Sequence, residues 1–97
     1  MPTAAPSAVP TVQVDNERVR VTEWRFAPGA ETGWHRHDHD YVVVPMTTGQ
    51  LRITTSTSEV IAELVLGQSY FRPALTEHNV INANSYELTF LELEMKP

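Results

Sequence analysis

The chain runs His35-Arg36-His37-Asp38-His39-Asp40 directly into the apolar segment Tyr41-Val42-Val43-Val44. Side chains two residues apart on an extended strand point to the same face, so a strand here would place His35, His37 and His39 in one row. Imidazole is the commonest protein ligand for first-row transition metals. The stretch therefore predicts a β-strand that carries a metal site. The alternative is a polar strand edge that happens to be rich in histidine.

Length and composition describe one small domain. The 97 residues suffice for a single core, and 41% of them are hydrophobic, which is ordinary for a folded soluble protein. The net charge of −5, with only 7 Lys and Arg, argues against a nucleic-acid partner and against docking on an anionic membrane. The absence of cysteine excludes disulfides, thiolate metal sites and cysteine nucleophiles.

The first ten residues predict no secretory signal, because they lack its basic and apolar regions. Their Pro, Ala and Ser content predicts a flexible N-terminal tail over residues 1–10, followed by a single domain over 11–97. No apolar run approaches the length of a transmembrane helix. We therefore expect a cytoplasmic protein.

Short runs of β-branched residues, separated by turn signals, predict an all-β domain. Strands are expected over residues 11–14, 18–27, 35–44, 50–55, 59–66, 69–72, 78–82 and 86–94. Residues 59–66 could instead form two helical turns, but their β-branched side chains favour a strand. Many short strands at this spacing imply a sandwich or a small closed barrel.

The second expected strand has an irregular pattern. Val19 and Val21 would lie on one face of it, and Trp24 and Phe26 on the other. This change of phase predicts a β-bulge midway along the strand.

Two segments carry motif-like spacing. The first contains Gly29, His35, His37 and Gly49, and the second contains Gly67, Pro73, His78 and Asn82. Together they resemble the two-part signature of the cupin family. Its first part is Gly, five residues, His-x-His, three or four residues, Glu, six residues and Gly. Its second part is Gly, five residues, Pro-x-Gly, two residues, His, three residues and Asn.

The resemblance extends from about Val12 to Met95 and implies a small antiparallel jelly-roll β-barrel with a divalent metal ion inside. His35, His37 and His78 correspond to the family's three histidine ligands. Taken alone, His78 could equally be a core histidine bonded to a backbone carbonyl. Imidazole ligands suit iron, nickel, zinc, manganese or copper, so the residues do not name the ion.

The chain departs from the signature at two positions. Leu75 stands where the family has the glycine of Pro-x-Gly, and the family glutamate would fall at Tyr41 or Val42. Alternation favours Tyr41 facing inward, where its neutral phenol would donate a hydrogen bond and serve as the catalytic residue. We therefore expect three protein ligands and open coordination positions. Asp40 would be a fourth ligand only if a bulge turned it inward, and His39 is more often a pocket residue than a ligand.

The resemblance also implies a function. Three-histidine cupins occur among metal-dependent dioxygenases, which predicts a dioxygenase or isomerase acting on a small organic acid or ketone. One alternative is a non-catalytic cupin that binds metal or a small-molecule ligand as a sensor or store. Another is a structural cupin that binds metal only adventitiously. Arg52 and Arg72 are the basic residues that could anchor a substrate carboxylate, although alternation favours a surface position for Arg52.

Two further expectations concern packing. Tyr70, Phe71 and Phe90 are expected in the core rather than at a substrate. The N-terminal strand would be a sheet edge with unpaired backbone groups, which need covering. Cupins also commonly pair N-terminal strands, so a homodimer is expected.

Overall fold

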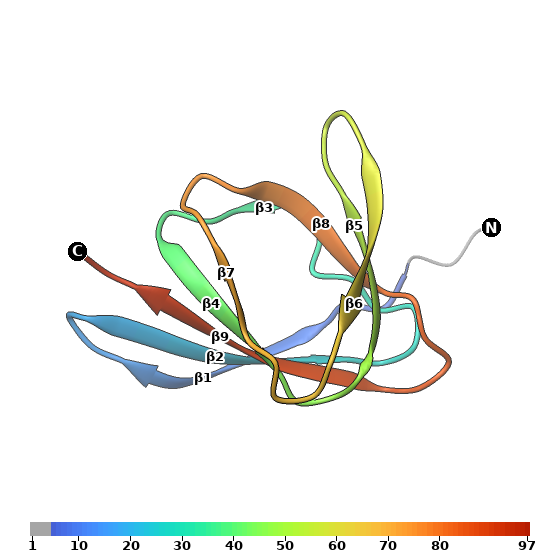
Figure 1. Cartoon of the computed structure of the whole chain (residues 1–97), viewed down its shortest axis with the longest axis horizontal. Helices are drawn as coiled ribbons and strands as arrows, with labels where there is room; N and C mark the ends of the chain where they lie inside the picture. The colour runs from blue at the N-terminus through green and yellow to red at the C-terminus, as the bar shows by residue number, and fades with distance from the viewer. Residues whose placement is uncertain (1–4) are drawn as a thin grey trace.

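The computed structural model describes residues 5–97, which form nine β-strands and no helix (Figure 1). The strands are β1 (Val9–Asp15), β2 (Val19–Phe26), β3 (His35–Arg36), β4 (Asp40–Pro45), β5 (Gly49–Thr54), β6 (Glu59–Leu64), β7 (Tyr70–Arg72), β8 (Glu77–Asn82) and β9 (Leu88–Met95). The predicted all-β class is confirmed. The segment with a helical alternative forms strand β6.

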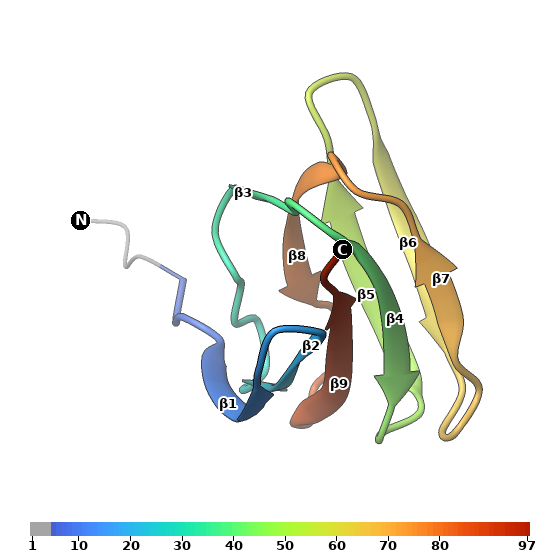
Figure 2. The same ribbon diagram turned by 90° about the vertical axis from the view of Figure 1, so that its left-hand side faces the viewer.

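The strands form two antiparallel sheets that face each other across a common interior (Figures 1 and 2). The larger sheet has the order β1-β2-β9-β4-β7, and the smaller has the order β3-β8-β5-β6. Neighbours in each sheet are mostly distant in sequence, as in a jelly roll, and all strand pairings are antiparallel. The predicted small antiparallel barrel is confirmed.

Alternating side chains build the core. Along β4, β8 and β9, buried positions alternate with less buried ones, because successive side chains point to opposite faces of a strand. Phe26 and Leu88 are fully buried, and the rings of Phe26 and Phe90 lie 5.4 Å apart. The inner faces of the two sheets therefore share one apolar core.

The predicted bulge in the second strand is wrong. Strand β2 keeps an unbroken register with β9 along its whole length. Its alternation continues because Thr22 faces inward with Trp24 and Phe26, while Val19 and Val21 face the outside of the sheet. The register shift lies instead in the neighbouring strand β1.

Strand β1 begins at Val9, two residues before the predicted start at Thr11. The backbone amide of Ala8 donates to the carbonyl of Glu31 at 2.8 Å, and the amide of Glu31 donates to the carbonyl of Pro6 at 2.9 Å. Residues 1–4 of the predicted tail lie outside the described residues. No helix in residues 5–97 has the length and apolar character that a membrane span requires.

The histidine stretch is not one continuous strand. Strand β3 ends at Arg36, β4 begins at Asp40, and residues 37–39 form a bend between them. The loop before β8 holds this bend, because the amide of His37 donates to Thr76 O (2.9 Å) and the amide of Leu75 donates to His37 O (2.8 Å). The predicted row therefore contains His35 and His37 but not His39.

Two positions of the family signature, Asn82 and Leu75, concern the backbone conformation. The buried Asn82 amide donates through Nδ2 to the carbonyls of Phe26 (3.1 Å), Ala27 (3.2 Å) and Tyr86 (2.8 Å). It thereby joins β8 to the ends of β2 and β9. Leu75 has a φ of 71°, a left-handed conformation that disfavours side chains with a Cβ. The family glycine would suit this position better.

Candidate metal centre

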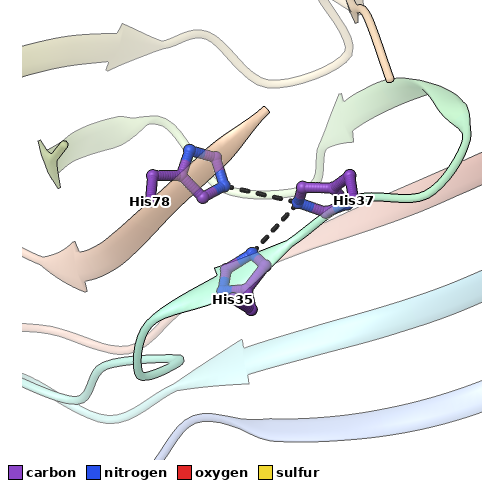
Figure 3. Close-up of side chains that lie close together, drawn as sticks. All are labelled: His35, His37 and His78. Carbon is purple, nitrogen blue, oxygen red and sulfur yellow. Dashed lines mark hydrogen bonds between the residues drawn. The ribbon is translucent and has the colours of Figure 1, made fainter. Parts of the chain in front are cut away.

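The side chains of three histidines, His35, His37 and His78, lie close together (Figure 3). His35 lies on β3 and is paired directly with His78 on β8, while His37 lies in the bend. The Nε2 atom of His37 is 3.0 Å from Nε2 of His35 and 3.3 Å from Nε2 of His78. His37 is 6% and His78 7% exposed, so the cluster is largely removed from water.

The spacing of these nitrogen atoms fits a single ion. With metal–nitrogen bonds of about 2.1 Å, separations of 3.0 and 3.3 Å correspond to angles of about 90–105° at the metal. Such angles suit three neighbouring positions of an octahedron or a tetrahedron. No carboxylate of residues 5–97 joins the three histidines, whose ligand atoms lie within 4.8 Å of one another.

The surroundings of two histidines turn Nε2 toward the common point. Nδ1 of His35 lies 2.9 Å from the carbonyl oxygen of Gly33. A carbonyl can only accept, so Nδ1 carries the proton and Nε2 keeps its lone pair. Nδ1 of His37 faces the carboxylate of Glu92, at 3.7 Å from Oε1. Acceptors behind metal-binding histidines commonly fix the ring orientation and tautomer in this way.

Burial keeps two of these histidines, His37 and His78, neutral. It lowers the pKa of His37 and of His78 from 6.5 to about 4 each, and the neighbouring imidazole of His35 adds to both shifts. Both rings are therefore unprotonated at neutral pH, which is the form that binds a metal ion.

Tyr41 faces the interior beside the cluster, as alternation predicts. Its side chain is 2% exposed, and its ring stacks on that of His37 with centroids 3.9 Å apart and planes 23° from parallel. Burial, followed by the charge of Glu92, raises the pKa of Tyr41 well above its ordinary value. Tyr41 is therefore a neutral phenol that can donate a hydrogen bond.

Glu92 is the site residue that sequence reasoning missed. It lies on β9, is 6% exposed and lines the same cavity as His35 and His78. Burial raises its pKa from 4.5 to about 7, with the charge of Glu94 as the next cause. Its inward direction could have been predicted from Leu88 and Phe90, which lie four and two residues before it. Side chains at every second position of a strand share a face.

The cavity next to the histidines is a small cleft of about 390 Å³, including the space at its mouth. Its walls are mainly apolar, with contributions from Trp24, Val43 and Phe90. Arg72 and Tyr70 line it as well.

Two residues near the histidines lie outside the cluster. The exposed carboxylate of Asp40 accepts a hydrogen bond from the amide of Ala74 through Oδ1 at 2.7 Å. His39 lines a separate surface depression together with Asp38 and Asp40. Asp40 therefore holds a loop, and the bend turns His39 away from the site.

The structure also tests the positions predicted for Arg52 and for three aromatic residues. Arg52 lies on the surface, with Nε 3.6 Å from Glu59 Oε1, as alternation favours. Phe90 is in the core and Tyr70 packs against it, but Phe71 is 53% exposed. The core prediction for Phe71 is wrong, because this residue alternates with Tyr70 and Arg72 on β7 and faces outward.

Comparisons with known proteins agree with this fold. The chain is 65% identical over 91 residues to the β-alanine degradation protein BauB of Pseudomonas aeruginosa, covering 94% of this chain and 96% of the relative. It also matches the crystal structure of a cupin domain from Bordetella pertussis with a TM-score of 0.97 and 58% identity, over 99% of this chain and 100% of that one.

A more distant similarity shows the fold alone. An RmlC-like cupin with a double-stranded β-helix fold from Methanocaldococcus jannaschii gives a TM-score of 0.77 at 16% identity, over 99% of this chain and 86% of that one. No family model matches the chain. On the strength of the fold and of the two similar sequences, the chain belongs to the cupin family.

Proposed function

We propose that this cupin binds one divalent transition metal ion through His35, His37 and His78 and is a metal-dependent enzyme acting on a small organic acid. The observation that carries this proposal is the convergence of three Nε2 atoms at ligand spacing. Iron, nickel, zinc, manganese and copper are all compatible with imidazole ligands. When bound, the ion would supply Lewis-acid or redox chemistry of the dioxygenase or isomerase type.

The incomplete ligand set supports catalysis. Structural metal sites are closed by protein ligands, whereas catalytic sites keep positions open for substrate or water. With three histidines and no carboxylate ligand among residues 5–97, positions would stay open on the side of the cavity.

The chain's own residues could bind and orient a ligand there. Tyr41, as a neutral phenol beside His37, would donate a hydrogen bond to the bound molecule. Glu92 has a pKa raised to about 7, so its carboxylate could take up or release a proton near neutral pH. The similar protein BauB is named for β-alanine degradation, which supports a small organic acid as the substrate class.

A second candidate function is metal or small-ligand binding without turnover. The burial of the site suits this alternative, since His37 is 6% and His78 7% exposed and an ion held there would be shielded from water. Both functions use the same three histidines, so metal binding alone does not separate them.

Turnover by the metal-loaded protein tests the proposal. The chelator-treated protein is reloaded with Fe²⁺, Ni²⁺, Zn²⁺, Mn²⁺ or Cu²⁺ and incubated with a panel of short-chain acids and ketones. Oxygen consumption and product formation are then measured. The proposal predicts turnover with one metal that is lost in His78→Ala. Ligand binding without product under all metals would favour the binding function.

We also propose a homodimer. Strand β1 is an edge of the larger sheet, and all seven of its residues are exposed. A row of apolar residues crosses the outer face of that sheet in register: Phe71, Val42, Leu93, Val21 and Val14. A second copy could cover both features. Deleting residues 1–14 should weaken the association, and a monomeric full-length protein by light scattering would refute the proposal.

A further inference from the structure

Arg72 lies on the inner wall of the barrel, close to the histidine cluster. In the register of β4 and β7 it stands directly opposite Tyr41. Residues opposite each other in an antiparallel pair project to the same face with Cβ atoms about 4.5–5.5 Å apart. Tyr41 in turn stacks on His37, and Arg72 lines the same cavity as His35 and His78. Arg72 therefore shares the cavity with the candidate metal ligands, and it also borders a surface groove beside Tyr70 and Glu63.

The guanidinium group is held in place without being neutralised. Its Cζ atom lies 4.6 Å from the centroid of the Tyr70 ring, and its Nη1 donates to the carbonyl oxygen of Phe71 at 3.0 Å. Among residues 5–97, no carboxylate oxygen lies within 4.0 Å of it. By contrast, Arg25 and Arg52 each face a glutamate within that distance.

Most of its hydrogen-bond donors are available. A guanidinium group carries five N–H donors in a planar fork. Only one nitrogen of Arg72 has a protein acceptor in residues 5–97, and none of its nitrogens is both buried and without a partner. The remaining donors are therefore open to solvent, beside a cavity whose walls are otherwise mainly apolar.

Arg72 is the one arginine among the residues that line the cavity. Glu92 is the one carboxylate among the residues that line the cavity. A divalent ion and Arg72 together would outweigh this single negative charge, so the cavity would favour an anion.

We propose that Arg72 anchors the carboxylate of a short-chain carboxylic acid whose other end reaches the three-histidine site. This inference rests on the proposed function and names the group that selects its substrate. A guanidinium fork can donate two parallel hydrogen bonds to one carboxylate, which gives orientation as well as affinity. The apolar walls formed by Trp24, Val43 and Phe90 suit the aliphatic chain between the two ends.

Calorimetry with a matched pair of probes tests the proposal. The Ni²⁺-loaded protein is titrated with 3-hydroxypropionate and with its neutral amide. Loss of a charge-assisted hydrogen-bonded pair costs about 1.5–3 kcal/mol, which is about ten- to a hundredfold in affinity. The acid should therefore bind more tightly than the amide by about that factor. Arg72→Gln should remove the difference, and Arg72→Lys should restore only part of it.

Two controls separate the possible failures. Arg52→Gln removes a surface arginine outside the cavity and should leave binding of the acid unchanged. Nickel affinity and the unfolding temperature of Arg72→Gln should match those of the parent protein, because Arg72 is not a metal ligand. Arg72→Lys serves in place of Arg72→Gln if the latter does not fold.

Equal binding of acid and amide by the parent protein, or unchanged binding of the acid by Arg72→Gln, would overturn the role of Arg72. A parent protein that takes up no nickel would overturn the proposed function instead. The same titrations on the metal-free protein would then test the role of Arg72 by itself, because Arg72 lines the cavity whether or not an ion is bound. A preference for the acid that Arg72→Gln removes would support the anchor, and no preference would overturn it.

Discussion

Acid should destabilise the metal-free protein through the buried histidines. His37 and His78 have pKa values lowered from 6.5 to about 4 in the native protein. Between these values the unfolded chain binds a proton at each imidazole that the native protein does not bind. The free energy of unfolding therefore rises with pH across this window and falls when pH decreases from 6.5 toward 4.

The size of this effect follows from the two shifts. One pKa unit corresponds to about 1.36 kcal/mol, so each imidazole contributes at most about 3 kcal/mol, and the pair at most about 6–7 kcal/mol. Glu92 opposes them, because its pKa is raised from 4.5 to about 7. Its native, protonated form contributes stability below pH 4.5 that is lost as pH rises through about 7. This offsets about 3 kcal/mol, so the net loss from pH 7 to pH 4 is about 3 kcal/mol.

Urea unfolding of the metal-free protein at pH 4 to 8 measures this profile. Glu92→Gln removes the opposing group, so its stability should fall by up to about 6 kcal/mol over the same range, more steeply than that of the parent protein. A parent profile that is flat from pH 7 to pH 4, or a Glu92→Gln profile that is no steeper, would refute this reasoning.

Three further predictions concern the ion, Tyr41 and Leu75. Metal at a hundred times its Kd should stabilise the fold by about 2.7 kcal/mol in thermal unfolding, while the chelated protein should still unfold cooperatively; a chelated protein without a transition would contradict this. Tyr41→Phe should leave metal affinity nearly unchanged by calorimetry but weaken ligand binding or turnover, and a large loss of metal affinity would make Tyr41 a ligand. Leu75→Gly should raise the free energy of unfolding by up to about 1 kcal/mol in urea, since glycine relieves the positive φ at a smaller entropic cost. A lower value would mean that the exposed Leu75 side chain contributes more than the strain costs.

Alternation along the strands allowed much of the fold to be predicted. The strands around Gln50 and Val60 and the pairing of the site histidines depend on local pattern and on a spacing that the family shares. The burial of Tyr41 follows from the same alternation, because strand β4 is regular over its whole length.

Contacts between distant segments account for the differences. The bend that turns His39 away exists because His37 bonds to Thr76 and Leu75, which lie in the loop before the neighbouring strand β8. Glu92 was missed because its neighbours Leu91 and Leu93 are apolar, and apolar residues of a strand are expected to face the core. In the structure Leu91 and Leu93 face the outside of the sheet, and Glu92 faces the interior. Which face of a strand is inside depends on the neighbouring strands, and the sequence of β9 alone does not contain that information.

Metal titration of the chelator-treated protein by calorimetry tests the central claim most directly. The account predicts one divalent ion per chain for the parent protein and for His39→Ala. It predicts a severe loss of affinity for His35→Ala, His37→Ala and His78→Ala, because two imidazoles alone hold an ion weakly. Full occupancy with unchanged affinity in His78→Ala would contradict the account, since the ion would then be bound elsewhere than at the point where the three Nε2 atoms meet.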